Sequence, residues 1–465
     1  MKVEQLYTGC LSEMAYYIES NGEAAIIDPL RETTPYLDLL KKNKTKLKYI
    51  FLTHFHADFV SGQVDLSKET GATIVFGPNA NPNYEFHSAL DGERFEIGDI
   101  QLELLHTPGH TLESSSYVLT DKEGNKPYVF TGDCLFIGDV GRPDLAVKSE
   151  LTADDLASYL YDSLRNKIMP LPDDIIIYPN HGAGSACGKN MSSETFDTLG
   201  NQKKVNYALN PDMSREDFVA EVTSGLASPP QYFPKNVKMN KEVNSSYKDI
   251  LKRGTRALSA EDFAELAKRE DVLVLDTRSN KVYSEQGTIP GAWYIGIDGG
   301  FAPWVGALIR DIDQKIILLA DENGQEEVVT RLSRVGYDNS LGYLKGGLDA
   351  WKKQGYPVSK IGSISADEML EGLNNGQVRH PLDLRKPSEF AKGHIENIEN
   401  FALDTLLENI DTLDKNQTYT LHCQSGYRSL VAASILKSKG FESIVDVRGG
   451  FKALKDLGAK IVEMV

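Results

Sequence analysis

Residues 53–59 read Thr-His-Phe-His-Ala-Asp-Phe and directly follow an apolar, strand-like run at 49–52. The heptad therefore places two imidazoles and one carboxylate, each two positions apart, in a loop at the end of a strand. Nitrogen and oxygen donors at this spacing are a common opening of a metal site. Such a site needs further ligands from elsewhere in the chain, so the heptad predicts a sheet-based, metal-binding domain.

Further metal-type residues follow other short β-branched runs in the first part of the chain. His110 follows Thr-Pro-Gly, Asp133 follows Thr-Gly, and His181 follows Tyr-Pro-Asn. Loops at strand ends can converge on one point of a rigid sheet. We expect His54, His110 and Asp133 to bind a metal ion, because two histidines and one carboxylate are the ligand set of non-haem Fe(II) sites that bind substrate and O₂. Zinc with a bound hydroxide on the same residues is the alternative.

Phe59 bears on the number of metal ions. Two-metal hydrolases built on this motif place histidine after the aspartate, and a phenyl ring cannot coordinate a cation. We therefore predict one metal ion rather than two. His56, Asp58 and His181 are then expected to lie around the site as hydrogen-bonding partners instead of binding the ion.

Composition limits the remaining choices. A chain of 465 residues is too long for one hydrophobic core and predicts two to four domains. The net charge of −17 argues against a nucleic-acid partner. No signal peptide or membrane-spanning stretch is expected. Four cysteines in so long a chain do not indicate a disulfide framework, which favours a reducing cytoplasm.

The C-terminal half repeats itself with a period of roughly a hundred residues. Leu-Asp-x-Arg occurs at 275–278 and 382–385, and Gly-Gly-x-x-Ala closes each copy at 346–350 and 449–453. So long a period indicates a duplicated domain, and strands alternating with amphipathic stretches predict α/β units over parallel sheets. The preceding segment 228–246 is rich in proline and asparagine and is interpreted as a domain tail and linker.

Cys423 opens the sequence Cys-Gln-Ser-Gly-Tyr-Arg-Ser behind an apolar strand of the second copy. Gly426 allows a tight loop whose backbone N–H groups turn inward and form an anion-binding nest. Arg428 adds a positive charge, and the following helix contributes its N-terminal dipole. These features favour thiolate over thiol, so we predict that Cys423 is a nucleophile that accepts and releases sulfane sulfur.

The first copy lacks this chemistry. Asp321 stands at the cysteine position and Glu326 at the arginine position. Two carboxylates would repel the sulfur oxyanions that such a loop holds. We expect this copy to pack domains or subunits together, with binding of a regulatory ligand as the alternative.

Cys187 lies in a glycine-rich loop directly behind His181, beside the expected metal site. A thiol at this place is either a relay or substrate-contacting group or an incidental loop residue. The residues alone favour neither role over the other.

Several motifs together resemble known families. Thr-His-x-His-x-Asp, Thr-Pro-Gly-His, Thr-Gly-Asp and Tyr-Pro-Asn-His resemble the metallo-β-lactamase fold, an αββα sandwich. Phe59, Gly-Arg-Pro-Asp at 141–144 and the stretch 198–203 resemble the persulfide dioxygenases more than glyoxalase II. The loop at Cys423 resembles a rhodanese active site. The whole chain is similar to the bacterial persulfide dioxygenase–rhodanese fusions of sulfide detoxification that carry a degenerate rhodanese copy.

This resemblance implies an α/β multi-domain chain with a metallo-β-lactamase-fold persulfide dioxygenase domain and C-terminal linker at 1–248, a degenerate rhodanese-like domain at 249–358 and a catalytic rhodanese domain at 359–465. It implies one Fe(II) on His54, His110 and Asp133, where O₂ oxidises a thiol persulfide to sulfite. Sulfur transfer through Cys423, with Arg428, then gives thiosulfate. Arg142, Cys187 and Gly426 are expected to contact substrates. Relatives of the metal domain also imply a homo-oligomer, a dimer or tetramer.

Other assignments stay open at this point. The thiol carrier could be glutathione, coenzyme A, bacillithiol, cysteine or inorganic polysulfide. A zinc glyoxalase II-like thioester hydrolase fused to a rhodanese would release thiol from an acyl-thioester without O₂ uptake. A sulfur-binding sensor or carrier with a structural metal would take up persulfide stoichiometrically at Cys423 without turnover.

Overall fold

The computed structural model describes residues 1–146, 151–226 and 228–463. The chain divides into two compact units. The first unit comprises residues 1–247 together with 333–336, and the second comprises 248–332 and 337–465. Within the described ranges, no helix combines the length and the apolar character that crossing a bilayer requires.

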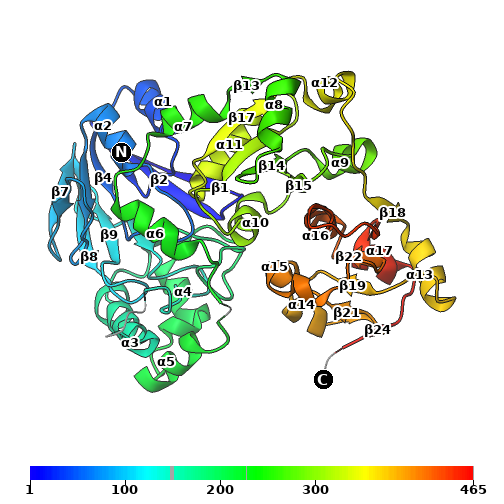
Figure 1. Ribbon diagram of the computed structural model, residues 1–465. Helices are drawn as coiled ribbons and strands as arrows, with labels where there is room; N and C mark the ends of the chain where they lie inside the picture. Colours follow the sequence, from blue (N-terminus) through cyan, green and yellow to red (C-terminus); the bar gives the residue numbers. More distant parts are fainter. Residues whose placement is uncertain (147–150, 227, 464–465) are drawn as a thin grey trace. The chain divides into compact units, whose positions relative to one another are not determined.

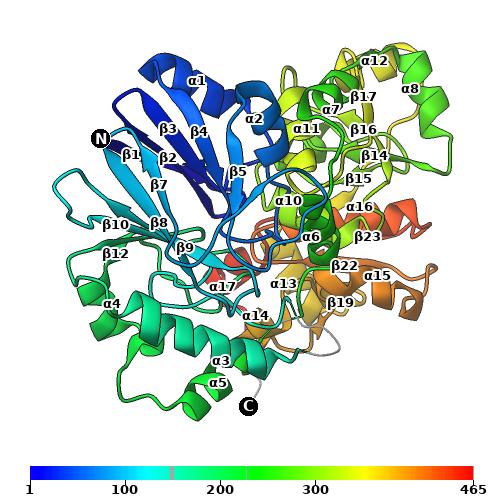
Figure 2. The ribbon, with the colours of Figure 1, turned by 90° about the vertical axis from the view of Figure 1, so that its left-hand side faces the viewer.

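The first unit is a four-layered sandwich of two mixed sheets between helices (Figures 1 and 2). Among the described residues the first sheet has six strands in the order β1 (Lys2–Thr8), β2 (Glu13–Ser20), β3 (Glu23–Ile27), β4 (Lys46–Phe51), β5 (Thr73–Phe76) and β6 (His87–Ser88). The second sheet has six in the order β12 (Asp197–Thr198), β11 (Ile176–Pro179), β10 (Tyr128–Gly132), β9 (Ser115–Thr120), β8 (Ile100–His106) and β7 (Arg94–Ile97), on the same basis. Figure 2 shows helices α1 (Thr34–Asn43) and α2 (Gln63–Thr70) along the outer face of the first sheet, and α3 (Ala153–Ser163) and α5 (Arg215–Thr223) along the outer face of the second. The predicted αββα sandwich is therefore confirmed.

Large aromatic side chains from both sheets fill the space between them. Tyr16 on β2 meets Phe130 on β10 with ring centroids 4.9 Å apart, and Phe51 on β4 meets Tyr117 on β9 at 4.8 Å. All four rings are buried in one core cluster. Burying one such side chain stabilises the fold by roughly 1.5–3 kcal/mol. This packing holds rigidly the strand ends from which the loops of the metal site extend.

Residues 228–246, predicted to be a domain tail and linker, contain helix α6 (Phe233–Lys241). Phe233, Asn236 and Asn240 on this helix are buried, and the segment belongs to the first compact unit. Proline at the second helical position, Pro234, suits a helix start because its missing N–H has no intrahelical partner there. The remaining short helices of the unit are η1 (Leu164–Ile168), α4 (Leu199–Val205) and η2 (Tyr207–Leu209).

The second unit contains two parallel sheets with the same strand order, as the repeat predicted. Within the described chain the first has five strands in the order β13 (Ala257–Leu258), β17 (Ser340–Leu344), β16 (Lys315–Leu319), β14 (Val272–Asp276) and β15 (Trp293–Tyr294). The second has five there in the order β18 (Gly362–Ile364), β23 (Ile444–Val447), β22 (Tyr419–His422), β19 (Pro381–Asp383) and β21 (Glu399–Asn400). Every pairing within these two sheets is parallel in the described part of the chain, and β20 (His394–Ile395) pairs with β24 (Ile461–Val462) separately.

Helices connect the strands of both copies, as crossovers between parallel strands require. The first copy contains α8 (Ala260–Ala267), α9 (Asn280–Gln286), α10 (Phe301–Leu308), α11 (Gln325–Arg334) and α12 (Gly347–Lys353), preceded by α7 (Tyr247–Gly254). The second contains α13 (Ala366–Asn374), α14 (Pro387–Ala391), η3 (Leu403–Thr405), α15 (Leu406–Asn409), η4 (Ile410–Thr412), α16 (Tyr427–Ser438) and α17 (Gly450–Asp456).

Candidate functional site

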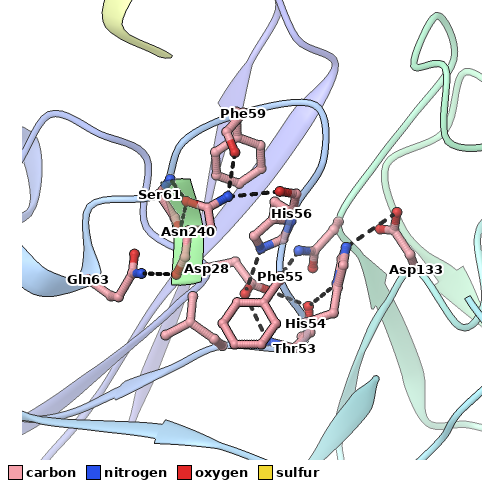
Figure 3. A network of polar contacts seen from close by, with 12 residues as sticks. Asp28, Thr53, His54, Phe55, His56, Phe59, Ser61, Gln63, Asp133 and Asn240 are labelled. Atoms are coloured by element: carbon pink, nitrogen blue, oxygen red, sulfur yellow. Dashed lines mark hydrogen bonds and ion pairs between the residues drawn. The ribbon is translucent and has the colours of Figure 1, made fainter. Parts of the chain in front are cut away.

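His54, His110 and Asp133 converge in the first unit from three separate strand ends, behind β4, β8 and β10. Their ligand atoms lie within 4.8 Å of one another, and all three side chains are buried. Nε2 of His54 lies 3.8 Å and Nε2 of His110 3.4 Å from Oδ2 of Asp133. Figure 3 shows the pair of His54 and Asp133 from close by. The structure thus places together the three residues predicted to bind a metal ion.

Hydrogen bonds fix the ring tautomer of both imidazoles. The hydroxyl of Thr53 donates to Oδ2 of Asp28 over 2.9 Å, so its oxygen accepts the Nδ1–H of His54, also over 2.9 Å. Nδ1 of His110 lies 2.9 Å from the carbonyl oxygen of Arg142, which can only accept. In their neutral form, both rings therefore carry hydrogen on Nδ1 and a lone pair on Nε2, the atom that faces the carboxylate. Neutral imidazole held in this way is the form that binds metals.

The other polar atoms of the group also suit a cation. Both carboxylate oxygens of Asp133 and Nε2 of His181 are buried without a hydrogen-bond partner among the described residues. Leaving such groups unpaired in a protein interior is costly, and a divalent cation would satisfy them. Burial, followed by the neighbouring rings of His56 and His110, lowers the pKa of His54 well below its ordinary value. The donor set therefore fits a metal ion such as Fe(II) or Zn(II).

His56, Asp58 and His181 form an adjoining group. Their ligand atoms also lie within 4.8 Å of one another, with Nε2 of His181 3.5 Å from Oδ2 of Asp58. His56 donates its Nε2–H to Asp28, and the buried ring of Phe59 stacks on its imidazole with centroids 4.3 Å apart. This group could hold a cation by itself. The prediction that these three residues do not bind a metal ion rests on Phe59, whose side chain has no donor atom.

Asp28 ties the metal loop to the neighbouring strand β3, a role that no motif indicated. Its carboxylate accepts the backbone N–H of Thr53, the Nε2–H of His56 and the Nδ2–H of Asn180, over 2.9, 2.9 and 2.6 Å. Asp28 follows an apolar strand, the same signal that singled out Asp133. Because Pro29 comes next, the dipeptide Asp28-Pro29 is also typical of a simple turn.

Asn240 of helix α6 holds the other side of the metal loop (Figure 3). Its side-chain amide donates to the carbonyl oxygens of His56 and Phe59, each over 2.8 Å. Its side-chain oxygen accepts the backbone N–H of Ser61 over 2.9 Å and the Ser61 hydroxyl over 3.1 Å. Asn240 is buried. Its partners are mostly backbone groups far away in the chain, so the sequence carries no pattern from which this role could be found.

Arg142 supports His110 through its backbone. Its carbonyl oxygen accepts from that imidazole, and its N–H donates to the carbonyl oxygen of Cys187 over 3.0 Å. The guanidinium is buried and pairs with Asp144, with Nε–Oδ1 and Nη2–Oδ2 distances of 2.6 Å. The charge predicted to meet the substrate is therefore engaged with a carboxylate two residues away.

Cys187 lies beside the metal group. Its Sγ falls within 4.8 Å of ligand atoms of Asp133 and His181, and its side chain is buried. Burial, and then the carboxylates of Asp58 and Asp133, raise the pKa of the Cys187 thiol well above its ordinary value. Burial and the two carboxylates therefore favour the thiol over the thiolate as long as no cation lies beside the sulfur.

Cys423 in the second unit directly follows strand β22, as predicted. Gly426 adopts a left-handed φ of 105° and donates its N–H to Sγ of Cys423 over 3.2 Å. The hydroxyl of Ser429 donates to the same sulfur over 3.6 Å, and α16 begins directly behind Gly426. Gly450 backs the loop, because a Cβ there would lie 2.3 Å from the carbonyl oxygen of Cys423.

Arg428 forms an ion pair that no motif indicated. Its Nη1 and Nη2 lie 2.5 and 2.9 Å from the carboxylate oxygens of Glu389 in the first turn of α14. The hydrogen bond from Arg428 lowers the pKa of Glu389, against its partial burial. The positive charge at the loop is therefore shared with a carboxylate. In the degenerate copy, Asp321 and Glu326 are both exposed.

Comparison with known proteins agrees with this architecture. The model of the metallo-beta-lactamase superfamily matches residues 8–181, and that of the rhodanese-like domain matches residues 259–354 and 365–457. A probable hydroxyacylglutathione hydrolase of Schizosaccharomyces pombe is 33% identical over 203 residues, which are 42% of this chain and 75% of that protein. A hydroxyacylglutathione hydrolase of Haemophilus influenzae is 31% identical over 200 residues, 38% of this chain and 89% of that protein.

A solved structure extends the likeness beyond the first unit. The crystal structure of a metallo-beta-lactamase from Staphylococcus aureus is 30% identical, has a TM-score of 0.63, and covers 74% of this chain and 98% of its own. The chain belongs to the metallo-beta-lactamase superfamily and carries two rhodanese-like domains behind its metallo-beta-lactamase domain.

Proposed function

We propose that this protein is an Fe(II)-dependent persulfide dioxygenase whose product, sulfite, is converted to thiosulfate by sulfur transfer at Cys423. The observation that carries the proposal is the buried group of two histidines and one carboxylate in a chain that also holds a cysteine in an anion-binding loop. Phe59 supports a single ion, and this ligand set is typical of mononuclear non-haem iron. Iron bound there would supply the activation of O₂.

The two reactions balance through sulfite. In the first, a thiol persulfide, O₂ and water give the free thiol, sulfite and two protons. In the second, Cys423 as thiolate takes the outer sulfur of another thiol persulfide, whose thiol is released, and the sulfur of sulfite then attacks that outer sulfur on Cys423. The new S–S bond forms thiosulfate, and Cys423 leaves as the thiolate.

Residues of the first unit orient the metal-binding imidazoles and limit the access of bulk water. Thr53 and the carbonyl of Arg142 hold the two imidazoles with Nε2 toward Asp133. The side chain of Cys187, which lies beside Asp133 and His181, would contact the substrate sulfur. Burial of the group limits the access of water to the oxidation site.

Residues of the second unit stabilise the leaving thiolate. The N–H of Gly426 and the hydroxyl of Ser429 point at Sγ of Cys423, and the N-terminus of α16 adds its dipole. These groups would hold negative charge on the sulfur both before loading and after release of thiosulfate. The ion pair of Arg428 with Glu389 lies at the same helix start.

A thioester hydrolase fused to a sulfurtransferase is the second candidate. Two observations favour it. The relatives described above are hydroxyacylglutathione hydrolases. In addition, His56, Asp58 and His181 supply donor atoms for a further ion. Zinc in this site would generate hydroxide that attacks an acyl-thioester.

One experiment separates the two candidates. Iron-reconstituted protein is given glutathione persulfide, and O₂ uptake, sulfite and thiosulfate are measured together. Zinc-reconstituted protein is given a hydroxyacylglutathione in parallel. We expect O₂ uptake with thiosulfate as the main product and little thioester cleavage. Thioester cleavage, with no O₂ uptake by protein shown to contain iron, would establish the hydrolase instead.

The Asp133→Ala variant tests the metal assignment inside the same chain. It should lose bound iron and O₂ uptake together, because the only carboxylate of the proposed ligand set is gone. Sulfur transfer from thiosulfate to cyanide at Cys423, which yields sulfite and thiocyanate, should persist and show that the second unit is intact, and circular dichroism should show that the first unit remains folded. O₂ uptake that persists in this variant would refute the assignment.

A further inference from the structure

The catalytic loop of the second rhodanese-like copy reaches the degenerate copy through Tyr427. This residue stands between Gly426, which donates to the nucleophile, and Arg428. Its hydroxyl donates to the carbonyl oxygen of Gly296 over 2.8 Å. Gly296 lies in the segment that joins β15 to α10 of the degenerate copy. Both copies belong to the same compact unit.

Gly299 of the same segment is shaped to the ring of Tyr427. A Cβ added at Gly299 would lie 2.2 Å from Cε2 and 2.3 Å from Cζ of that ring, which is impossible without movement. Its backbone does not need glycine, because Gly299 is not among the described glycines with positive φ. The neighbouring Gly300 differs, since a Cβ there would only touch Trp304 at 3.4 Å.

The helix behind the loop is also tied to the degenerate copy. The hydroxyl oxygen of Ser434 on α16 accepts the backbone N–H of Tyr294 over 2.8 Å. The hydroxyl oxygen of Ser438, one turn further, accepts the indole N–H of Trp293 over 2.8 Å. Strand β15, which carries both donors, therefore lies along α16. The catalytic loop and helix α16 are therefore both held by residues 293–296 of the degenerate copy.

Tyr427 is suited to act as a permanent donor. Burial, and then the carboxylate of Asp298, raise the pKa of Tyr427 above its ordinary value, so the hydroxyl keeps its proton at physiological pH. Its ring also lies 6.4 Å from that of Tyr294, centroid to centroid. Contact with the degenerate copy is therefore both polar and apolar.

We propose that the degenerate copy positions the catalytic loop, with Tyr427 as the positioning residue held between Gly296 and Gly299. Because Tyr427 directly follows Gly426, a shift of its ring would move the N–H that points at Sγ of Cys423. The degenerate copy needs no nucleophile for this role, which agrees with carboxylates at Asp321 and Glu326. The functional part of the test rests on the sulfur transfer proposed above, whereas the structural part does not.

Two adjacent glycines provide the test. Gly299→Ala should displace the ring of Tyr427 while leaving every residue of the catalytic loop unchanged, and Gly300→Ala is the matched control. Two quantities are measured in the full-length protein: hydrogen–deuterium exchange of the peptide covering 423–430, and kcat and KM for sulfur transfer from thiosulfate to cyanide. For Gly299→Ala we expect exchange at least about 10-fold faster and kcat lower by about 10-fold, since small misplacements of catalytic groups cost 10–100-fold. KM should change much less, and Gly300→Ala should match the wild type.

The outcomes are distinct. If Gly299→Ala matches Gly300→Ala in both measurements, or if exchange rises without loss of kcat, the proposal is overturned. Faster exchange only in Gly299→Ala, in a protein whose wild type transfers no sulfur, would support the anchoring of the loop and refute the sulfurtransferase function. Tyr427→Phe, which removes only the hydroxyl, serves if Gly299→Ala does not fold. Unchanged exchange and turnover in that variant would also overturn the proposal.

Discussion

Asp28 illustrates, at the scale of single residues, how the metal loop depends on a carboxylate outside the proposed ligand set. It accepts hydrogen bonds from Thr53, His56 and Asn180, and it is fully buried with a left-handed φ of 49°. Hydrogen bonds to a charged group contribute about 1.5–3 kcal/mol each. Through the Thr53 hydroxyl, this carboxylate also keeps the proton of His54 on Nδ1. The ligand lone pair is therefore set by a residue on a neighbouring strand.

We predict that Asp28→Asn lowers the affinity for iron by about 10–100-fold, as expected when an outer partner of a ligating histidine is lost. The amide has the same shape but no charge, and it cannot accept all of the hydrogen bonds that the carboxylate accepts. Iron retained against a chelator of known affinity is the measurement. Asp99→Asn is the control, because Asp99 is an exposed carboxylate that pairs with the side chain of Asn21. Equal retention in both variants would show that Asp28 does not act on the ligands.

The sequence led to residues whose chemistry is local, and it did not lead to those whose partners are distant. His54, His110 and Asp133 each follow a strand in a recognisable motif, and the structure brings them together. Asn240 and Tyr427 act mainly on backbone carbonyls of remote segments. Every residue has a backbone carbonyl, so the sequence does not show which carbonyls a side chain will meet. Neither residue could therefore be predicted without the fold.

Helix α6 closes the metal loop of the first unit from outside, so a whole secondary-structure element supports the site. Asn240 at its C-terminal end uses its amide N–H groups and its oxygen on residues 56–61. Its backbone carbonyl also accepts the hydroxyl of Tyr84 over 2.7 Å. Proline and asparagine suggested a linker at 228–246, but buried polar contacts of this kind make the segment part of the site.

Asn240→Ala should destabilise the first unit and weaken metal binding together. The substitution leaves the N–H of Ser61 and two buried carbonyls unpaired, which costs about 2–4 kcal/mol. The control is Asn244→Ala. Asn244 donates to the carbonyls of Met239 and Glu242 at the end of α6, and among the described residues its side chain makes no hydrogen bond with loop 53–61. Thermal unfolding and iron retention are measured for both variants. An equal loss of iron in both variants would assign the effect to the end of helix α6 in general, and not to the hydrogen bonds between Asn240 and loop 53–61.

Strand β23 carries a buried acid with a testable pH effect. Burial raises the pKa of Asp446 to about 6. The folded state therefore binds a proton more tightly than the unfolded state, whose pKa is near 3.8. Stability from this group is complete below about pH 4 and is lost as pH rises through about 6.

Asp446→Asn should remove this pH dependence. At pH 8 the variant should be more stable than the wild type by about 2–3 kcal/mol, because about two pKa units separate the two states. At pH 4 the two proteins should differ little. Urea unfolding at both pH values is the measurement, with Asp456→Asn on the exposed face of α17 as control. A variant that is no more stable than the wild type at pH 8 would mean that burial does not raise the pKa of Asp446 in the folded state.

The chain as a whole was predictable to the extent that its parts repeat a pattern. Leu-Asp-x-Arg at the end of β14 and of β19 predicted a duplication, and both parallel sheets have the same order of strands. In both copies the motif arginine pairs with the motif aspartate, Arg278 with Asp276 and Arg385 with Asp383. The contacts that join the copies involve Tyr427, Ser434 and Ser438, which lie outside the repeated motifs. The repeat therefore indicates the fold of each copy, but it does not indicate which role each copy has.

The linkage of two chemistries in one chain gives a prediction about products. In Cys423→Ser, O₂ uptake should stay within about 2-fold of the wild type, because the metal group is untouched, whereas sulfite should replace thiosulfate in the initial phase of the reaction. A serine oxygen cannot carry sulfane sulfur, so the second step has no acceptor. Cys10→Ser, at a half-buried thiol of the first unit, is the control and should still yield thiosulfate. If Cys423→Ser produces thiosulfate at the wild-type rate, sulfite is not consumed at Cys423. The fusion would then serve something other than keeping sulfite at high effective concentration near its acceptor.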